Sequence, residues 1–285
     1  LLVFGFALGP DRARLEQAAA GVLWVGERCA GGGGARRVGM GQDGARSGPR
    51  TGGIELGGIG KAYGATWAIR GVDLALDPGE SMALFGPNGA GKTTLLKILG
   101  TLVTPTRGSG RVAGFDLRTG REGIRENLAL LAHGTHLYED LTVRENLKFA
   151  AAMRNREGLR PEPLLERVGL AEAAGERVRA LSSGMKRRLA LAKVMLAEPG
   201  ILLLDEPFTN LDQAAVALLE GCVTEVLARG GSVIMATHDL ARGYAACRRA
   251  AILVNGRLLH EAPARGGGLE GLRAAYLAAT GEGGG

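Results

Sequence analysis

One stretch of the chain decides its fold: Gly86-Pro87-Asn88-Gly89-Ala90-Gly91-Lys92-Thr93. It fits the pattern G-x-x-x-x-G-K-[ST] at every fixed position. Its glycines let backbone N–H groups curl around a phosphate, and a helix that begins near Lys92 points its positive end at the same place. A plain glycine-rich turn is the alternative. The pattern predicts a nucleotide site in which Lys92 contacts the β- and γ-phosphates, Thr93 ligates Mg²⁺ and Thr94 adjoins them.

The segments around this stretch alternate between short apolar runs and helical patterns. The short apolar run Met82–Phe85 precedes it, and a helical pattern over Lys92–Leu99 follows it. Two more continuous apolar runs, Ile201–Leu204 and Ser232–Ala236, are typical of strands in a sheet that is covered on both faces. Strands that alternate with helices in this way predict an α/β fold.

Further along, residues 115–198 are predicted to be mostly helical. Thr142 and Glu145 have the spacing of a capping box at a helix start, and Gly184–Leu196 is predicted to form another helix. Asn-Gly in Val254-Asn255-Gly256-Arg257 favours a two-residue hairpin turn.

Composition separates a short first segment from the rest. Of the 285 residues, 46% are hydrophobic and 22% charged, as in an ordinary soluble globular protein. The first 53 residues hold seven arginines and four acids and contain the run Gly31–Gly34. We interpret 1–53 as a flexible or non-native N-terminal extension and 54–285 as the functional domain. The basic surplus suits nucleic acid or an anionic membrane, and equally a composition with no target.

Three cysteines, Cys29, Cys222 and Cys247, are scattered and outside any metal-ligand spacing. They favour a reducing compartment over a disulfide framework. The sequence has no run of about 18 apolar residues, so we expect no segment that spans a membrane.

Two carboxylates, Asp205 and Glu206, follow the apolar run Ile201–Leu204. The run by itself indicates only a buried strand. Because ligands of open α/β sheets bind at the carboxyl ends of the strands, we expect Asp205 beside the phosphate loop as a Mg²⁺ partner. Glu206 is then placed to polarise an attacking water as a general base.

A third motif, Leu181-Ser182-Ser183-Gly184-Met185, comes just before a predicted helix. A simple helix N-cap explains it when it is taken alone. Together with the phosphate loop, Asp205-Glu206 and a later His238, the motif resembles the ABC ATPase family, whose signature is L-S-G-G-Q. The match is partial, because serine and methionine stand at the third and fifth positions.

The resemblance implies a P-loop NTPase fold with a mixed sheet core, an antiparallel β-subdomain and a helical subdomain. It also implies a site shared between two subunits, because the family's signature caps the γ-phosphate of nucleotide held by the opposite subunit. Ser182 and Gly184 are the retained positions, and a hydroxyl with a bare backbone at a helix N-terminus suits a phosphate. A second ABC ATPase subunit, expected to be a second copy of this chain, is therefore an expected partner.

Three further residues match positions of the family. Tyr63 resembles its aromatic that stacks on adenine, although a lone tyrosine there is equally often a core residue. His238, after the run Ser232–Ala236, resembles the histidine that contacts the γ-phosphate, and a structural histidine is the alternative. Asp212 matches the loop that couples the two composite sites.

One family element is absent from the sequence. A glutamine normally follows the strand before the helical subdomain, where it touches Mg²⁺ and relays to the membrane subunit. The chain has only Gln17, Gln42 and Gln213, and His133 or Gly134 takes that place. His133 is a polar replacement for the amide, and a plain loop histidine is the other interpretation.

The resemblance covers residues 54–262 and is strongest to one kind of exporter. The segment Leu137–Leu147 and the run Glu206-Pro207-Phe208-Thr209 look closest to the ATPase of the bacterial haem exporter used in cytochrome c maturation. The basic triplet Lys186-Arg187-Arg188 looks like exporter ATPases that pair with a separate membrane subunit, and a solvated helix face explains it as well. Leu1–Pro10 resembles part of that system's permease.

The resemblance therefore implies an ATP hydrolase coupled to transport, with ATP and Mg²⁺ as cofactors and a separate transmembrane permease as a partner. It places the chain on the cytoplasmic face of the inner membrane, with no nucleic acid partner. The alternatives are an exporter ATPase for drugs, lipids or polysaccharides, and a soluble ABC ATPase acting on ribosomes or DNA. A binding module without hydrolysis is disfavoured, because Lys92 and Glu206 are both present.

Overall fold

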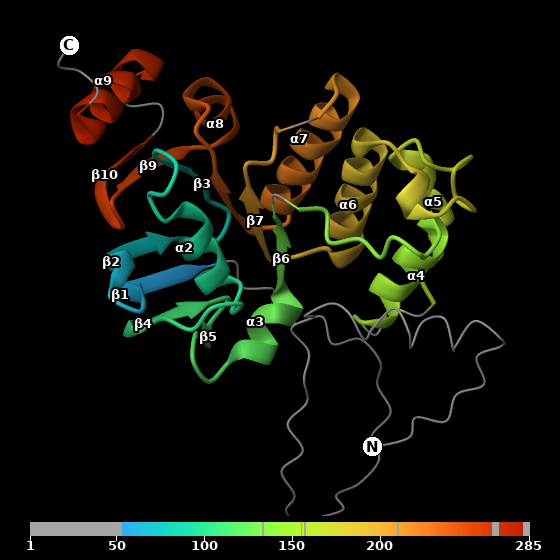
Figure 1. Cartoon of the computed structure of the whole chain (residues 1–285), viewed down its shortest axis with the longest axis horizontal. Coiled ribbons are helices and arrows are strands. Elements are labelled where there is room, and N and C mark those ends of the chain that lie inside the picture. Colours follow the sequence, from blue (N-terminus) through green and yellow to red (C-terminus); the bar gives the residue numbers. More distant parts are fainter. Residues whose placement is uncertain are drawn as a thin grey trace, which may run out of the picture.

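In the computed structural model, residues 53–281 are described, apart from 133, 155, 157, 210 and 264–267. The N-terminal extension predicted for residues 1–53 lies outside these residues except for Gly53. Two sheets and the helices around them make up the described chain, with the antiparallel sheet on one side and a helical group on the other (Figure 1). This arrangement confirms the predicted α/β fold.

The larger sheet has six strands in the order β10-β9-β3-β8-β7-β6. Its strands from β9 to β6 are parallel, and β10 is antiparallel to β9. Every residue of β3, β7 and β8 is buried, as continuous apolar runs predict for a sheet covered on both faces. The bounds are β3 Ser81–Phe85, β6 Leu128–Leu131, β7 Ile201–Asp205, β8 Ser232–Ala236, β9 Arg249–Val254 and β10 Arg257–Pro263.

The smaller sheet is antiparallel, with strand order β2-β1-β4-β5. Helix α2 (Lys92–Leu99) shares one hydrophobic core with β1 and β2 of this sheet and with β3, β7, β8 and β9 of the larger one. The helix that follows the phosphate loop is therefore fixed by both sheets. The bounds are β1 Ile54–Tyr63, β2 Thr66–Leu76, β4 Arg107–Val112 and β5 Phe115–Asp116.

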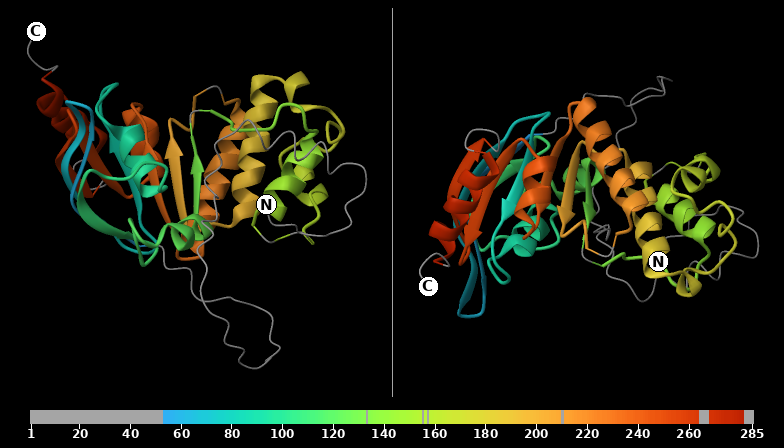
Figure 2. Two further views of the ribbon diagram at one scale, coloured as in Figure 1. Left: turned by 60° about the horizontal axis from the view of Figure 1, so that its bottom comes forward. Right: turned by 90° about the horizontal axis from the view of Figure 1, so that it is seen from above.

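A second core covers the other face of the larger sheet. It contains apolar residues of α6 (Ser183–Ala197), α7 (Gln213–Ala228), α8 (Leu240–Ala246) and α9 (Gly268–Thr280). Helix α9 lies at one end of the molecule, and the helices α4 and α5 lie at the other (Figure 2).

The helical subdomain has a core of its own. It is formed by α4 (Val143–Ala152), α5 (Glu162–Arg167), the short 3₁₀ helix Val178–Ala180 and one face of α6. The predicted capping box is present, because Thr142 Oγ1 accepts from Glu145 N at 3.2 Å and Glu145 Oε2 accepts from Thr142 N at 2.8 Å. Besides α3 (Arg121–Asn127), the start of the range 115–198 holds the strands β5 and β6, so it is less helical than predicted.

The hairpin between β9 and β10 turns through Asn255 and Gly256, whose φ values are 50° and 77°. Val254 pairs with Arg257, so the turn has the two residues that Asn-Gly predicts.

Both cysteines in the described part of the chain, Cys222 and Cys247, are free and buried. Burial raises the pKa of the Cys222 thiol to about 11 and that of Cys247 to about 12. Among the described residues, no helix is long and apolar enough to cross a membrane.

Candidate nucleotide site

The phosphate loop joins the end of β3 to the start of α2. Gly91 stands at the N-cap of α2 with φ 106° and brings no side chain, so the first N–H groups of the helix face the loop directly. Such a helix start is a ready site for an anion. Gly89 also has a positive φ, of 79°, in the region that favours glycine.

Two glycines also let the loop pass between its neighbours. A Cβ on Gly86 would lie 2.1 Å from the carbonyl oxygen of Leu253 in β9, and a Cβ on Gly91 would lie 2.5 Å from that of Ala68 in β2. The β9–β10 turn supports the loop as well, because Gly256 N donates to Ala90 O at 2.9 Å. The glycines are therefore required by packing as well as by phosphate chemistry.

Lys92 holds its ammonium inside the loop. Its side chain donates to the carbonyl oxygen of Gly86 and, at 3.2 Å, to that of Pro87, and the residue is only 7% exposed. Burial lowers its pKa, and the negative charges of Glu206 and Asp205 oppose that shift. The loop thus contains a confined positive charge next to two carboxylates.

Thr93 and Asp205 meet at the carboxyl end of β7. Thr93 Oγ1 donates to Asp205 Oδ2 at 2.8 Å, and Asp205 is 4% exposed. A hydroxyl and a carboxylate are hard oxygen ligands of the kind that Mg²⁺ prefers. The donor set therefore fits the predicted metal.

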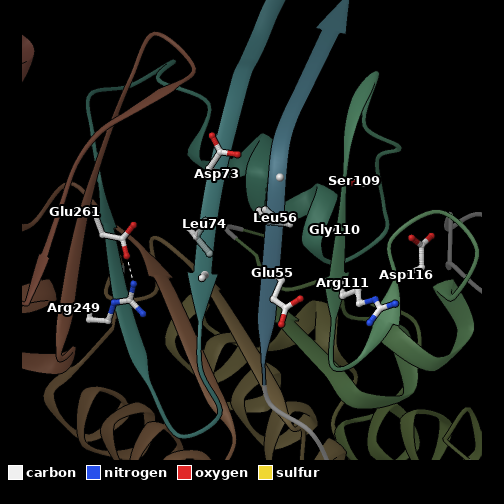
Figure 3. Close-up of a pocket in the computed structure, with 12 residues that line it drawn as sticks. Glu55, Leu56, Asp73, Leu74, Ser109, Gly110, Arg111, Asp116, Arg249 and Glu261 are labelled. Atoms are coloured by element: carbon white, nitrogen blue, oxygen red, sulfur yellow. Dashed lines mark hydrogen bonds and ion pairs between the residues drawn. The ribbon is translucent and has the colours of Figure 1, made fainter.

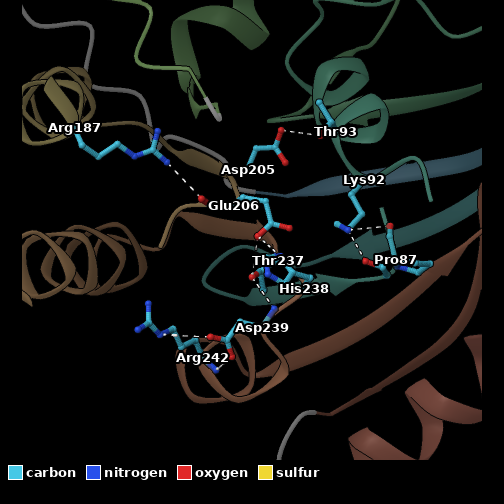
Figure 4. A network of polar contacts seen from close by, with 11 residues as sticks. Pro87, Lys92, Thr93, Arg187, Asp205, Glu206, Thr237, His238, Asp239 and Arg242 are labelled. Carbon is cyan, nitrogen blue, oxygen red and sulfur yellow. Dashed lines mark hydrogen bonds and ion pairs between the residues drawn. The ribbon is translucent and has the colours of Figure 1, made fainter. Parts of the chain in front are cut away.

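Glu206 lies directly beyond β7, beside the end of β8. Its carboxylate accepts from Thr237 Oγ1 at 3.3 Å and lies 2.9 Å from His238 Nδ1 (Figure 4). The His238 side chain is 66% exposed, whereas that of Glu206 is 19% exposed. An acid in contact with an exposed imidazole at a strand end can orient a water molecule and exchange its proton.

Two helix N-termini carry the signature residues and Asp212. Ser182 is the N-cap of α6, and its Oγ accepts from Met185 N at 3.3 Å, so the simple N-cap is present. Asp212 caps α7 by accepting from Ala215 N at 2.7 Å. A Cβ on Gly184 would lie 3.8 Å from Asp212 Oδ2, which places the two segments side by side.

Comparisons with known proteins agree with this geometry. Residues 69–209 match the family model "ABC transporter". The chain is 35% identical over 213 residues to the "Nod factor export ATP-binding protein I" of Paraburkholderia xenovorans (strain LB400), covering 73% of this chain and 70% of that protein. The chain belongs to the ABC transporter family, as an ATP-binding subunit.

Two further matches bear on this ABC ATPase. It is 38% identical over 186 residues to "Cytochrome c biogenesis ATP-binding export protein CcmA 2" of Cupriavidus metallidurans (strain ATCC 43123 / DSM 2839 / NBRC 102507 / CH34), covering 64% of this chain and 87% of that protein. A solved structure described as "Dimeric structure of a post-hydrolysis state of the ATP-binding cassette MJ0796 bound to ADP and Pi" superposes with a TM-score of 0.68. It is 25% identical and covers 75% of this chain and 99% of that one.

The structure brings the predicted residues of the ABC ATPase into two groups. Lys92, Thr93, Asp205, Glu206 and His238 form one, around the strand ends of the larger sheet. Ser182, Ser183, Gly184, Met185 and Asp212 form the other, at the N-termini of α6 and α7.

Tyr63 belongs to neither group. It ends β1, its side chain is 51% exposed, and Lys61 Nζ lies 5.0 Å from its ring centroid. The exposure is at odds with a core tyrosine, and the stacking role stays a prediction.

His133, which with Gly134 is one of the two candidates for the place of the family's glutamine, lies outside the described residues. The loop around it is held by α6 at two points. Arg187 Nη1 donates to Ala132 O at 2.9 Å, and Lys193 Nζ donates to His136 O at 2.9 Å.

Arg187 is the residue that the sequence did not single out. Its guanidinium also points at Glu206 O, at 3.5 Å, and the residue is 5% exposed, so it is not part of a solvated face. Burial lowers its pKa, and the charge of Asp205 opposes the shift. Helical spacing was the available signal, because Arg187 lies three and four residues before the buried Ala190 and Leu191.

A cavity of about 640 Å³ lies elsewhere, over β1, β2 and β4 beside β10 (Figure 3). Its lining includes charged side chains of the antiparallel sheet, together with Arg249 of β9 and Glu261 of β10. None of the phosphate-loop residues or of the carboxylates at the end of β7 is among its lining, so it does not mark the nucleotide site.

Proposed function

We propose that this chain hydrolyses ATP as the motor subunit of an ABC exporter, and that two copies of it enclose two nucleotides. The carrying observation is the cluster at the strand ends, where Thr93 meets Asp205 and Glu206 meets His238. A confined lysine, a hydroxyl–carboxylate pair and an acid with an imidazole partner are the groups that phosphoryl transfer to water requires.

In the proposed mechanism the phosphate loop binds the phosphates of ATP through its N–H groups and the start of α2. Lys92 exchanges its contacts with Gly86 and Pro87 for the β- and γ-phosphates. Thr93 and Asp205 would hold Mg²⁺, and the bound ion would neutralise phosphate charge. Glu206 orients the attacking water and accepts its proton, while His238 holds the Glu206 carboxylate and faces the γ-phosphate.

The second copy completes each site in this proposal. Ser182, Ser183, Gly184 and Met185 of one subunit cap the γ-phosphate bound by the other, and Asp212 couples the two sites. The related cassette whose solved structure is described as dimeric with ADP and Pi supports this arrangement. Closure over nucleotide then favours one conformation of a separate permease on the cytoplasmic face of the inner membrane.

We infer that the transported cargo is haem, which is exported for cytochrome c biogenesis. The support is the resemblance of Leu137–Leu147 and Glu206–Thr209, together with the cytochrome c biogenesis relative of which the chain covers 87%. The relative named for Nod factor export favours a rival cargo, so the cargo needs its own test.

A Glu206→Gln variant tests the hydrolytic assignment. We expect ATP affinity to change by less than about twofold, phosphate release to fall by at least about 100-fold, and ATP to shift the variant to a dimer in size-exclusion chromatography. The matched control is Glu220→Gln, an exposed acid on α7. Hydrolysis by Glu206→Gln at the rate of the control would refute the assignment.

Deletion of the gene from its own host tests the cargo. If haem is exported, membrane-bound cytochrome c should disappear, and a plasmid copy of the normal gene, but not of Glu206→Gln, should restore it. Unchanged cytochrome c levels in the deletion strain would assign the motor to another exporter.

A further inference from the structure

The residue with the most unexpected position is Arg187, on the second turn of α6. The guanidinium donates to Ala132 O, just past the end of β6, and points at Glu206 O, just past the end of β7. Glu206 lies between Arg187 on one side and Lys92 on the other (Figure 4). One side chain of the signature helix therefore reaches two strand ends of the ATP-binding core.

The backbone of Glu206 has a strained conformation that its neighbours must stabilise. Its φ is 47°, in the left-handed region, which is strained for a residue other than glycine. Its N–H donates to Ala236 O at 2.8 Å in β8, and its carbonyl faces Arg187. This turn of the backbone directs the carboxylate to Thr237 and His238.

The contact between Arg187 and the Glu206 carbonyl acts mainly through the charge of the guanidinium. At 3.5 Å the bond to Glu206 O is long, but the guanidinium is nearly excluded from water, and there a charge acts strongly on a carbonyl dipole. Asp205 adds a negative charge that favours the cation. A buried arginine is costly unless its partners are well placed, so a purely space-filling role would suit an apolar residue better.

We propose that Arg187 is a positioning residue for Glu206: it fixes the backbone of the general base and the end of β6 to the signature helix. The position of α6, whose N-cap is Ser182, then sets where the Glu206 carboxylate of its own subunit lies. This inference rests on the proposed function, since it assigns Glu206 the role of base.

Steady-state kinetics of Arg187→Met and Arg187→Lys test the proposal. We expect kcat for ATP hydrolysis to fall by about 10- to 100-fold in Arg187→Met, because a displaced base loses orientation while the phosphate loop is untouched. The dissociation constant for ATP should stay within about twofold. Arg187→Lys keeps the charge but loses the second donor arm, so it should recover part of kcat.

The matched control is Arg156→Met. Arg156 also donates to a main-chain carbonyl of α6, Leu196 O at 2.9 Å, but at the far end of the helix from Glu206. Its kcat should be normal. Thermal unfolding of every variant shows which ones are folded, and if Arg187→Met is unfolded, the kcat of Arg187→Lys decides.

A combined variant separates positioning from plain structure. In a Glu206→Gln background, Arg187→Lys should lower the residual rate no further, because it acts through a carboxylate that is gone. A normal kcat in folded Arg187→Lys and Arg187→Met, or a further independent loss in the combined variant, would overturn the proposal. Normal hydrolysis by Glu206→Gln alone would instead refute the proposed function.

Discussion

The Lys92 ammonium donates hydrogen bonds to carbonyl oxygens of its own loop. The loop is therefore held in shape by the same ammonium that ATP would recruit, and Asp205 and Glu206 keep that ammonium charged against the effect of burial.

Replacement of Lys92 by alanine should weaken ATP binding by about 10- to 1,000-fold, because a charge-assisted contact to phosphate is lost from a partly dehydrated site. Titration with a fluorescent ATP analogue measures this. Lys97→Ala, on the exposed side of the same helix, is the control and should bind normally. Equal affinities of the two variants would contradict the phosphate-loop interpretation.

Lys193 predicts a pH dependence of stability. Burial lowers its pKa from 10.5 to about 8, with Arg154 adding to the shift. Between about pH 8 and about pH 10.5 the folded chain has lost this proton while the unfolded chain keeps it, so the free energy of unfolding gains a contribution that rises with pH. The full difference is on the order of 3 kcal/mol.

Urea unfolding of the normal chain and of Lys193→Met over this pH range measures that contribution. Other titrating groups are common to both proteins and cancel. The normal chain should gain stability relative to Lys193→Met as the pH rises, and a constant difference would show that Lys193 does not carry the shift.

At the scale of residues, the sequence predicted the members of the strand-end cluster because each one follows an apolar run or a glycine pattern. Arg187 was not predicted, since a basic triplet on a helix has the same appearance whether it faces water or the core. The positive φ of Glu206 was also hidden, because nothing in the residue type demands it.

At the scale of elements, the phosphate loop packs tightly between the β1–β2 hairpin and the β9–β10 hairpin. Gly91 and Gly89 both have positive φ, so alanine strains the backbone at either position by about 1–2 kcal/mol. They differ in surroundings, because a Cβ at Gly91 meets Ala68 O at 2.5 Å and one at Gly89 meets nothing within 4 Å.

Gly91→Ala should therefore be destabilised by about 2 kcal/mol or more beyond Gly89→Ala, in line with overpacking costs in rigid surroundings. Chemical denaturation without nucleotide gives this difference directly. If both variants unfold at the same denaturant concentration, the loop is not wedged against β2.

Strands β3 and β8 and helix α2 were predicted close to their observed bounds, because an uninterrupted apolar run or a clear helical period marks each of them. Strand β6 was not, since four apolar residues that directly follow a polar helical segment fit a buried last turn of that helix equally well. Its place beside β7 is decided by contacts that are distant in sequence.

At the scale of the whole molecule, the proposed function assigns the two groups of site residues to composite sites that one chain cannot complete. The first group would hold nucleotide, and the second, at the starts of α6 and α7, would serve the partner. This division was implied by the family resemblance and could not be read from periodicity or spacing.

A mixture of two inactive variants tests whether each site is shared between two subunits. Lys92→Ala removes the phosphate contact, and Ser182→Arg blocks the signature. Each alone should hydrolyse ATP at less than about a tenth of the normal rate, whereas a mixed dimer contains one intact loop facing one intact signature and should regain activity. Mixtures that stay inactive, although native mass spectrometry shows mixed dimers, would contradict composite sites.

The deep burial of Cys222 and Cys247 has a practical consequence. The thiolate is the form of cysteine that attacks thiol-directed reagents, and with pKa values of about 11 and about 12 both sulfurs remain protonated at neutral pH. After replacement of Cys29, the folded cassette is a silent background for maleimide dyes. A single Glu220→Cys substitution, at an exposed position on α7 outside both groups of site residues, would then carry one fluorophore at a known place without obstructing the proposed site.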